Sequence, residues 1–255
     1  MTGRISLLAA AALGALLGVG TPPEEGFASP DSASAAGLYA MELRVATVAR
    51  VRMVGRTRSV ATSLLLVDLQ RGKGGWVQSH RVCEARVDSG SALAELIVPR
   101  AFVGALAPRS YRAVLGSAGA RYTADMGEEA IGFDPGLTGS TLPRDPTHPG
   151  VQDPDGDGEP GVTLRLRVAG LGSARLFVVQ RSHLLLDGRR VAPDRFEGTV
   201  EVRLQEQHTL GADPGIFRQN PSIRADPSRS GFTLVRIPPA SGCEELHEQA
   251  AALFR

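Results

Sequence analysis

The stretch from Val162 to Val168 reads VTLRLRV, with an apolar residue at every second position. Side chains of a β-strand point alternately to its two faces, so this pattern predicts a strand with one face in a core and the other in solvent. The same alternation runs through residues 41–53, MELRVATVARVRM, where the even positions include four charged residues. Two half-solvated strands of this kind favour an antiparallel sheet.

Shorter segments between turn signals extend the pattern. Residues 59–69 and 76–87 predict two strands separated by the glycine-rich turn 71–75. Asp187-Gly188 is a common hairpin turn pair and is expected to end the apolar run before it. Further strands are predicted at 110–115, 121–124, 176–181, 184–186, 196–204 and 232–237.

Helical signals are few. Residues 91–106 are predicted to hold a short helix, with Pro99 starting a new turn because proline does not fit a helix interior. The tail predicts a helix over 243–254, since its apolar residues recur every three or four positions after the capping-box spacing of Ser241 and Glu244.

Two long loops interrupt the strands. One is expected at 125–161, where six prolines between residues 133 and 161 argue against regular structure, and the other at 211–230. Eight to ten strands with one terminal helix predict a mostly β chain, an antiparallel β-barrel or β-sandwich with a short C-terminal α-helix. We expect a single β-rich domain over residues 39–255.

The first residues predict export. Arg4 precedes an uncharged apolar run from Ile5 to Val19, which is short for a bilayer span but fits a secretory signal peptide at 1–28. Residues 29–38 are small and polar and predict a flexible leader. No later segment is predicted to cross a membrane, so we expect a periplasmic or extracellular location.

The charge balance gives little information about partners. The full chain has 28 basic and 27 acidic residues, and without residues 1–28, which carry Arg4, Glu24 and Glu25, the counts fall to 27 and 25. Such a balance provides no electrostatic steering toward nucleic acid, and aromatic residues that could stack on bases are sparse. No nucleic-acid partner is expected, and any other partner is unknown.

The two cysteines, Cys83 and Cys243, predict a disulfide in an oxidising compartment. Neither lies in a C-x-x-C motif or near a paired histidine, which makes the alternative of a zinc site less favourable. The bond would tie the C-terminal segment to a strand in the first half of the chain.

The sharpest local motif is Asp153-Pro154-Asp155-Gly156-Asp157-Gly158-Glu159. Three carboxylates at alternate positions with glycine can place hard oxygen ligands around one calcium ion. The segment resembles the D-x-D-x-D-G loops of EF-hands and thrombospondin type 3 repeats. That resemblance implies Ca²⁺ ligation by the side chains of Asp153, Asp155 and Asp157 and by the backbone carbonyl of Glu159.

The resemblance covers only these seven residues. Leu164 stands where an EF-hand has its bidentate glutamate, and the flanks are predicted to be loop and strand instead of helices. Missing ligands would have to come from elsewhere, for example Asp125, Glu128 or Asp145. The alternative is an acidic Asp-Gly turn that opens a strand.

A second motif, Asp88-Ser89-Gly90, resembles the D-[ST]-G signature of aspartic peptidases. Those enzymes use two aspartates that share one proton, and no second copy is present here, so Asp88 would have to act in a homodimer. The alternative is a strand that ends in a turn. G-x-S-x-G and H-E-x-x-H motifs are absent from the sequence, so serine-hydrolase and zinc-protease chemistry find no support.

Three hypotheses follow. The leading one is an exported, non-enzymatic β-rich domain with a structural calcium loop. The second is a lipocalin-like carrier that holds a small apolar ligand inside a barrel. The third is a hydrolase of the aspartic-peptidase type that uses Asp88.

Overall fold

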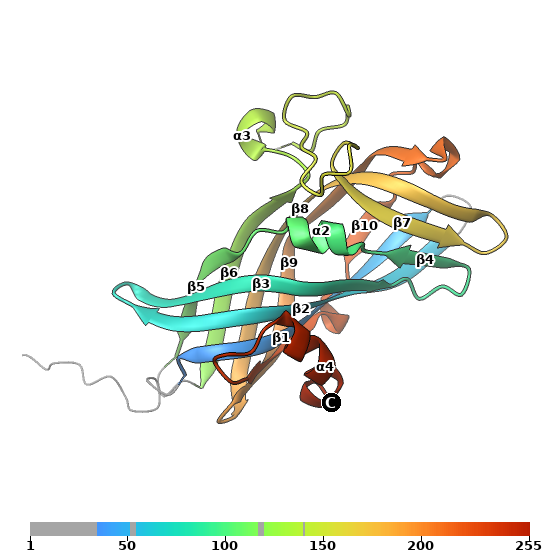
Figure 1. Cartoon of the computed structure of the whole chain (residues 1–255). Coiled ribbons are helices and arrows are strands. Elements are labelled where there is room, and N and C mark those ends of the chain that lie inside the picture. Colours follow the sequence, from blue (N-terminus) through green and yellow to red (C-terminus); the bar gives the residue numbers. More distant parts are fainter. Residues whose placement is uncertain (1–34, 52–54, 117–119, 140) are drawn as a thin grey trace, which may run out of the picture.

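The structure, a computed structural model, describes residues 35–51, 55–116, 120–139 and 141–255, so the predicted signal peptide and most of the predicted leader lie outside the described residues. The chain forms one antiparallel sheet with short helices at its edges (Figure 1). The strands are β1 (Gly37–Val51), β2 (Gly55–Gly72), β3 (Gly75–Asp88), β4 (Ala94–Ile97), β5 (Arg109–Leu115), β6 (Arg121–Ile131), β7 (Val162–Val168), β8 (Gly172–Ala192), β9 (Arg195–Asp213), β10 (Ser222–Ala225) and β11 (Gly231–Arg236). The helices are α2 (Arg100–Ala105), α3 (Pro135–Thr138) and α4 (Cys243–Leu253), with 3-10 turns η2 (Gly215–Phe217) and η3 (Pro227–Arg229).

Strand pairing closes the sheet into a ring. Around it the order is β1, β2, β3, β5, β6, β8, β9, β11 and back to β1, and every pairing is antiparallel. The predicted fold class, a mostly β antiparallel barrel or sandwich with a C-terminal helix, is therefore confirmed. Each strand of this ring therefore has a partner on both sides over at least part of its length.

Different strands complete the barrel wall at its two ends. One edge of β3 pairs with β5 through residues 76–80 and with β4 only at Val87. One edge of β8 pairs with β7 through residues 172–178 and with β6 through residues 180–189. Hence the β5–β6 pair completes one end of the wall and the β4–β7 pair the other, and α2 lies between the two pairs (Figure 1).

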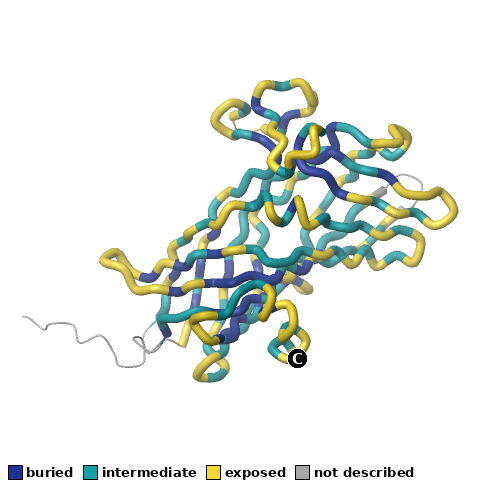
Figure 2. Tube along the Cα trace, viewed as in Figure 1, coloured by how far each residue is buried: buried dark blue, intermediate teal, exposed yellow. Residues whose placement is uncertain are grey.

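Apolar side chains at alternate strand positions point inward and fill the barrel interior at the β5–β6 end. Tyr39, Tyr122 and Phe196 are almost completely buried, and the centroid of the Phe196 ring lies 6.0 Å from that of Tyr39 and 5.6 Å from that of Tyr122. Figure 2 shows the buried positions along the strands and the exposed ones mainly in loops and turns. The fully or nearly buried members of this core are Ala35, Tyr39, Met41, Leu43, Leu65, Val67, Leu69, Trp76, Ala113, Tyr122, Ala124, Met126, Leu186, Phe196, Val200, Phe232 and Leu234.

Helix α4 covers the outer face of β1 and β2. Leu246 is buried against Leu64, Leu66 and Ile237 in a separate apolar cluster. Cys243, the first residue of α4, is bonded to Cys83 of β3, with 5.2 Å between the two Cα atoms. The predicted disulfide is thus present, and it holds the C-terminal helix on the barrel.

The loop predicted at 125–161 is shorter than expected. β6 continues to Ile131, with a register shift between Asp125 and Glu128 where the strand pairs with β8. The proline-rich segment also contains α3, where Pro135 occupies the first turn, a position that needs no backbone N–H. The leader prediction is likewise too long, because β1 already begins at Gly37.

The hairpin predicted at Asp187-Gly188 is wrong. β8 runs through this pair to Ala192, and Gly188 lies opposite Gly198 of β9. A Cβ at Gly188 would come within 2.6 Å of the Glu197 carbonyl oxygen and of the Phe232 ring. The glycine therefore permits close packing in mid-strand and does not form a turn.

Smaller differences have similar causes. Within 91–106, residues 94–97 form β4 and only 100–105 are helical, with Pro99 as the N-cap. The segment 211–230 holds the end of β9 and all of β10 as well as loop. The cap of α4 is Gly242, whose N–H donates to Glu245 (2.9 Å), instead of the predicted Ser241 and Glu244. Across the described ranges, we find no helix with the length and apolarity that a membrane span requires.

Candidate metal site in the loop before β7

The acidic motif lies in the connection from β6 to β7, and this connection is anchored to the barrel. The Gln152 N–H donates to the Gly132 carbonyl (2.9 Å), and the Gly161 N–H donates to the Gln152 carbonyl (2.8 Å). Phe133 forms a β-bridge with Val151 and is buried in an apolar cluster with Val179 and Leu210. The motif is therefore held at both ends although most of its residues are exposed.

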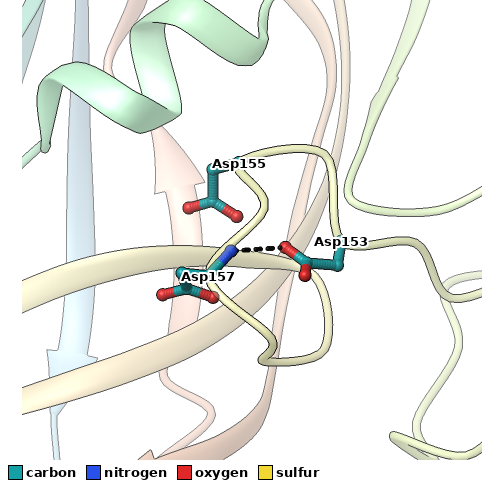
Figure 3. A group of neighbouring side chains, drawn as sticks. All are labelled: Asp153, Asp155 and Asp157. Carbon is teal, nitrogen blue, oxygen red and sulfur yellow. Dashed lines mark hydrogen bonds between the residues drawn. The ribbon is translucent and has the colours of Figure 1, made fainter.

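Three carboxylates of the motif converge. One ligand oxygen each from Asp153, Asp155 and Asp157 can be chosen so that all three lie within 4.8 Å of one another, and such a cluster could hold a metal ion. Figure 3 shows the three side chains around one turn of the loop. Gly156 and Gly158 have φ of +68° and +84°, a left-handed conformation that lets the chain turn this sharply.

Asp153 organises the backbone of the turn. Its Oδ1 accepts hydrogen bonds from the N–H groups of Gly156 (2.8 Å) and Asp157 (3.2 Å), and its Oδ2 accepts one from Gly158 (2.8 Å). The bond to Asp157 is the dashed line in Figure 3. An ionised carboxylate has about four acceptor sites, so these bonds still leave lone pairs for a cation.

Asp155 and Asp157 both connect the turn to the start of β7. Thr163 is 5% exposed; its N–H donates to Asp155 Oδ2 (2.9 Å) and its hydroxyl to Asp157 Oδ2 (2.7 Å). Thr163, the second residue of β7, thus contacts two of the three predicted ligands. A cation at the cluster would be mechanically coupled to the barrel wall through Thr163.

One oxygen of the cluster is buried without a partner. Asp155 Oδ1 is inaccessible to solvent and has no hydrogen-bond partner among the described residues. Burial raises the pKa of Asp155, the hydrogen bond from Thr163 opposes this rise, and the negative charges of Asp157 and Asp153 add to it. A buried anionic oxygen beside two further carboxylates is unfavourable unless a cation neutralises it.

The side chains of the other acidic candidates form contacts outside the group of three carboxylates. The Glu159 side chain forms an ion pair with Arg175 (3.0 Å), so only its backbone carbonyl remains for the predicted role. Asp125 bonds to His183 (2.7 Å), while Asp145 accepts hydrogen bonds from Thr147.

Glu128, the last auxiliary candidate, is also directed elsewhere. Its carboxylate lies 3.9 Å from the Arg181 guanidinium on the neighbouring strand β8. Because these four acidic side chains are engaged outside the cluster, backbone carbonyls and water are the remaining candidates for further oxygen ligands.

Asp88, the predicted peptidase residue, is the last residue of β3 and lies elsewhere on the barrel. Its Oδ1 accepts a hydrogen bond from the Gly90 N–H (2.8 Å), as expected for a strand that ends in a turn. It lines a pocket of about 230 Å³ together with Asp226, Arg58 and Arg229. Arg58 and Arg229 of the same pocket give it positive charge beside the two carboxylates, whereas a peptidase site needs two aspartates that face each other.

Sequence inspection missed a polar layer inside the barrel. Gln78 and His80 alternate with Trp76 and Val82 on the inward face of β3, and both are buried (0% and 4% exposed). The available signal was their parity, since they share the even positions with Trp76. It went unused because polar residues in a strand are normally assigned to the solvent face.

Comparison with known proteins gives no family for this chain, because neither a protein-family model nor a curated protein nor a solved structure matches it.

Proposed function

We propose that this protein is an exported, non-enzymatic β-barrel domain whose β6–β7 loop is stabilised by one calcium ion at Asp153, Asp155 and Asp157. The observation that carries the proposal is the buried, unpartnered Oδ1 of Asp155 beside two other carboxylates. A divalent cation would supply the missing partner and remove the repulsion among the three charges.

The donor set fits calcium by its chemistry. Calcium prefers six to eight oxygen ligands, and carboxylates that bind through one or both oxygens, backbone carbonyls and water are its usual partners. The three aspartates would provide the charge, and the Glu159 carbonyl, as the motif implies, with water would complete the shell. Few protein ligands and an exposed rim suggest a Kd on the order of 10⁻⁴ to 10⁻³ M, as in extracellular modules.

The role of the ion would be structural. Asp155 and Asp157 accept hydrogen bonds from Thr163, which lies at the start of β7. An ion bound to these aspartates would therefore fix the loop to the wall of the barrel. α3 is four residues long and the other flank is a strand, so the motif lacks the two flanking helices that open in a calcium switch.

Calorimetric titration and thermal melts test the calcium proposal. Protein comprising residues 29–255, with the disulfide formed, should bind about one Ca²⁺ and melt at a higher temperature in 5 mM CaCl₂ than in EDTA. Asp155→Asn should abolish this difference, whereas Asp145→Asn, a matched change in the same loop outside the cluster, should retain it. Equal melting temperatures of the unsubstituted protein in CaCl₂ and EDTA would rule out the calcium site.

Export rests on two features. The Cys83–Cys243 disulfide is the kind of bond that persists in oxidising compartments, and residues 1–28 carry the predicted signal peptide. Mass spectrometry of the protein recovered from the medium or periplasm of its producing host should find an N-terminus at Ser29. An intact N-terminus on cytoplasmic protein would contradict export.

The two alternatives gain less support. Bulky side chains such as Tyr39, Met41 and Phe196 are buried in the interior at the β5–β6 end, which leaves less space there for the large apolar ligand of a lipocalin-like carrier. For the peptidase, Asp88→Asn should abolish any acid-pH proteolysis that the purified protein displays.

A further inference from the structure

The inner face of β3 carries two adjacent polar side chains in an otherwise apolar row. Gln78 and His80 follow Trp76 at steps of two residues, so all three lie on the same face of the strand. Gln78 is fully buried and His80 is 4% exposed. These two residues and the groups that surround them are called the polar layer below.

The Gln78 amide forms one hydrogen bond among the described residues, and it does so through its oxygen. Its Oε1 accepts a hydrogen bond from the hydroxyl of Tyr122, which is itself completely buried. Its Nε2, a donor, has no partner among the described residues. The amide therefore presents N–H groups that require an acceptor.

His80 has no hydrogen-bond partner on either ring nitrogen within the described chain. Its ring packs edge-on against Tyr111, with the centroids 5.0 Å apart, so its contacts there are aromatic. Burial lowers its pKa to about 4, which keeps the imidazole neutral. A neutral imidazole has one donor and one acceptor nitrogen, and here both lack a partner.

Charged groups border this layer on β5 and β6. Arg109 lies opposite His80 in the strand register, and its Nε is 3.6 Å from Glu129 Oε1. Burial raises the pKa of Glu129, and Arg109 opposes that rise. The pair balances its own charge, so the layer as a whole favours an uncharged occupant.

The layer lies next to the break in the barrel wall. Beyond His80, β3 has no strand partner on this edge until Val87, as far as the described residues extend. Helix α2 contacts β3 and β7 across this break, and its Phe102 is buried against Val162 and Val178. A six-residue helix instead of a strand thus covers the wall beside His80 (Figure 1).

We propose that Gln78 and His80 form an internal binding site for a small uncharged molecule that carries hydroxyl or carbonyl oxygen. An oxygen acceptor would satisfy Gln78 Nε2, and a hydroxyl would serve the donor and acceptor nitrogens of His80. Three buried polar atoms on two neighbouring side chains would otherwise each cost free energy, and native proteins rarely leave such groups unpaired. Ordered water and an organic hydroxyl or carbonyl compound share this chemistry.

A crystal structure at atomic resolution, with ¹⁵N spectra of the imidazole, tests the site directly. Density within hydrogen-bond distance of Gln78 Nε2 and His80, and ¹⁵N shifts of a hydrogen-bonded neutral ring, are expected. Mass spectrometry of a denatured extract of the same protein then separates the sources: an organic mass that co-purifies identifies a compound, and its absence together with density identifies water. No density, or rotation of both side chains onto protein partners, would overturn the proposal.

Substitution provides a second criterion that does not depend on crystals. Removing an occupied site should lower the melting temperature of His80→Phe, because the bound oxygen loses its partners. If the site is empty, the same apolar replacement should raise the melting temperature, since two unpaired buried nitrogens disappear. Met126→Leu, in the neighbouring apolar core, serves as the control for repacking; a rise for His80→Phe above this control would contradict occupancy.

Discussion

The carboxylate turn before β7 and the polar layer inside the barrel present the same physical problem in opposite settings. Each contains buried polar atoms with no partner among the described residues: Asp155 Oδ1 in the turn, and Gln78 Nε2 with both nitrogens of His80 in the barrel. The turn is anionic and lies at the surface, while the layer is neutral and enclosed. The first therefore calls for a cation and the second for an uncharged hydrogen-bonding molecule.

The two sites also differ in how the chain builds them. The turn is made by consecutive residues and needs only Thr163 from the strand that follows. The polar layer is assembled by register, which brings His80 of β3 opposite Arg109 of β5, and by the barrel, which adds Glu129 of β6. A local site should thus tolerate changes in the barrel that a register-built site does not.

Removal of the disulfide should have the largest effect on stability, and it should affect the polar layer but not the carboxylate turn. The Cys83→Ser, Cys243→Ser variant is expected to lose roughly 3–5 kcal/mol of unfolding free energy, because the bond closes a loop between residues 160 apart. Urea denaturation measures this loss. Cys83 belongs to β3, the strand of the polar layer, so the ¹⁵N signals of His80 should change while the calcium-induced rise in melting temperature persists.

A calcium response that disappears in this variant would contradict the independence of the turn. Oxidised and reduced samples of the unsubstituted protein provide the control, since they differ only in the bond.

Protonation of His80 at acid pH should lower the unfolding free energy by less than removal of the disulfide does. The pKa of His80 falls from 6.5 in the unfolded chain to about 4 in the folded one, so the unfolded state binds more protons between these values. Stability is then complete above about pH 6.5 and falls as the pH drops toward 4, by up to about 3 kcal/mol. Denaturation curves at several pH values measure the slope.

His80→Phe should flatten that slope, and His247→Gln, a matched change of an exposed histidine on α4, should leave it in place. An unchanged slope in His80→Phe would show that carboxylates alone cause the acid sensitivity.

The effect of Asp155→Asn on stability should have opposite signs without and with calcium. In EDTA the substitution removes a buried charge whose pKa is raised, so stability at neutral pH should stay equal or increase. In 5 mM CaCl₂ the variant should be less stable than the unsubstituted protein by about 1–2 kcal/mol, which is the linkage expected for a sub-millimolar to millimolar site. Melts in both buffers measure the reversal, and destabilisation of equal size in both would indicate a purely structural aspartate.

The contrast explains what sequence inspection could and could not predict. Alternation of period two in segments such as 162–168 depends only on local residues, and it predicted the strands and their antiparallel class. Apolar residues at steps of three and four, which are equally local, predicted the terminal helix. The same local logic identified Asp153, Asp155 and Asp157, which converge as expected. The disulfide followed from there being only two cysteines.

Predictions that depended on long-range packing were wrong or absent. Asp187-Gly188 reads as a turn in isolation, but Gly188 is needed where Glu197 and Phe232 come close to the backbone. Glu129 and Arg109, which are 20 positions apart in sequence, become neighbours only when β5 and β6 close one end of the wall. No window of sequence contains that information.

Arg175 tests how local the turn is and should give the smallest effect. Its guanidinium pairs with Glu159 and Asp213 at 3.0 Å, but it is exposed to solvent, so Arg175→Gln should change the unfolding free energy very little. Glu159 adjoins the predicted ligands, and loss of a neighbouring positive charge should tighten calcium binding, by roughly two- to threefold at low salt and less at high salt. Titrations at two salt concentrations measure this, with Arg167→Gln on the exposed face of β7 as the control. If Arg175→Gln instead weakens calcium binding, then the ion pair with Glu159 positions the backbone of the turn, and the site extends beyond its three aspartates into β8.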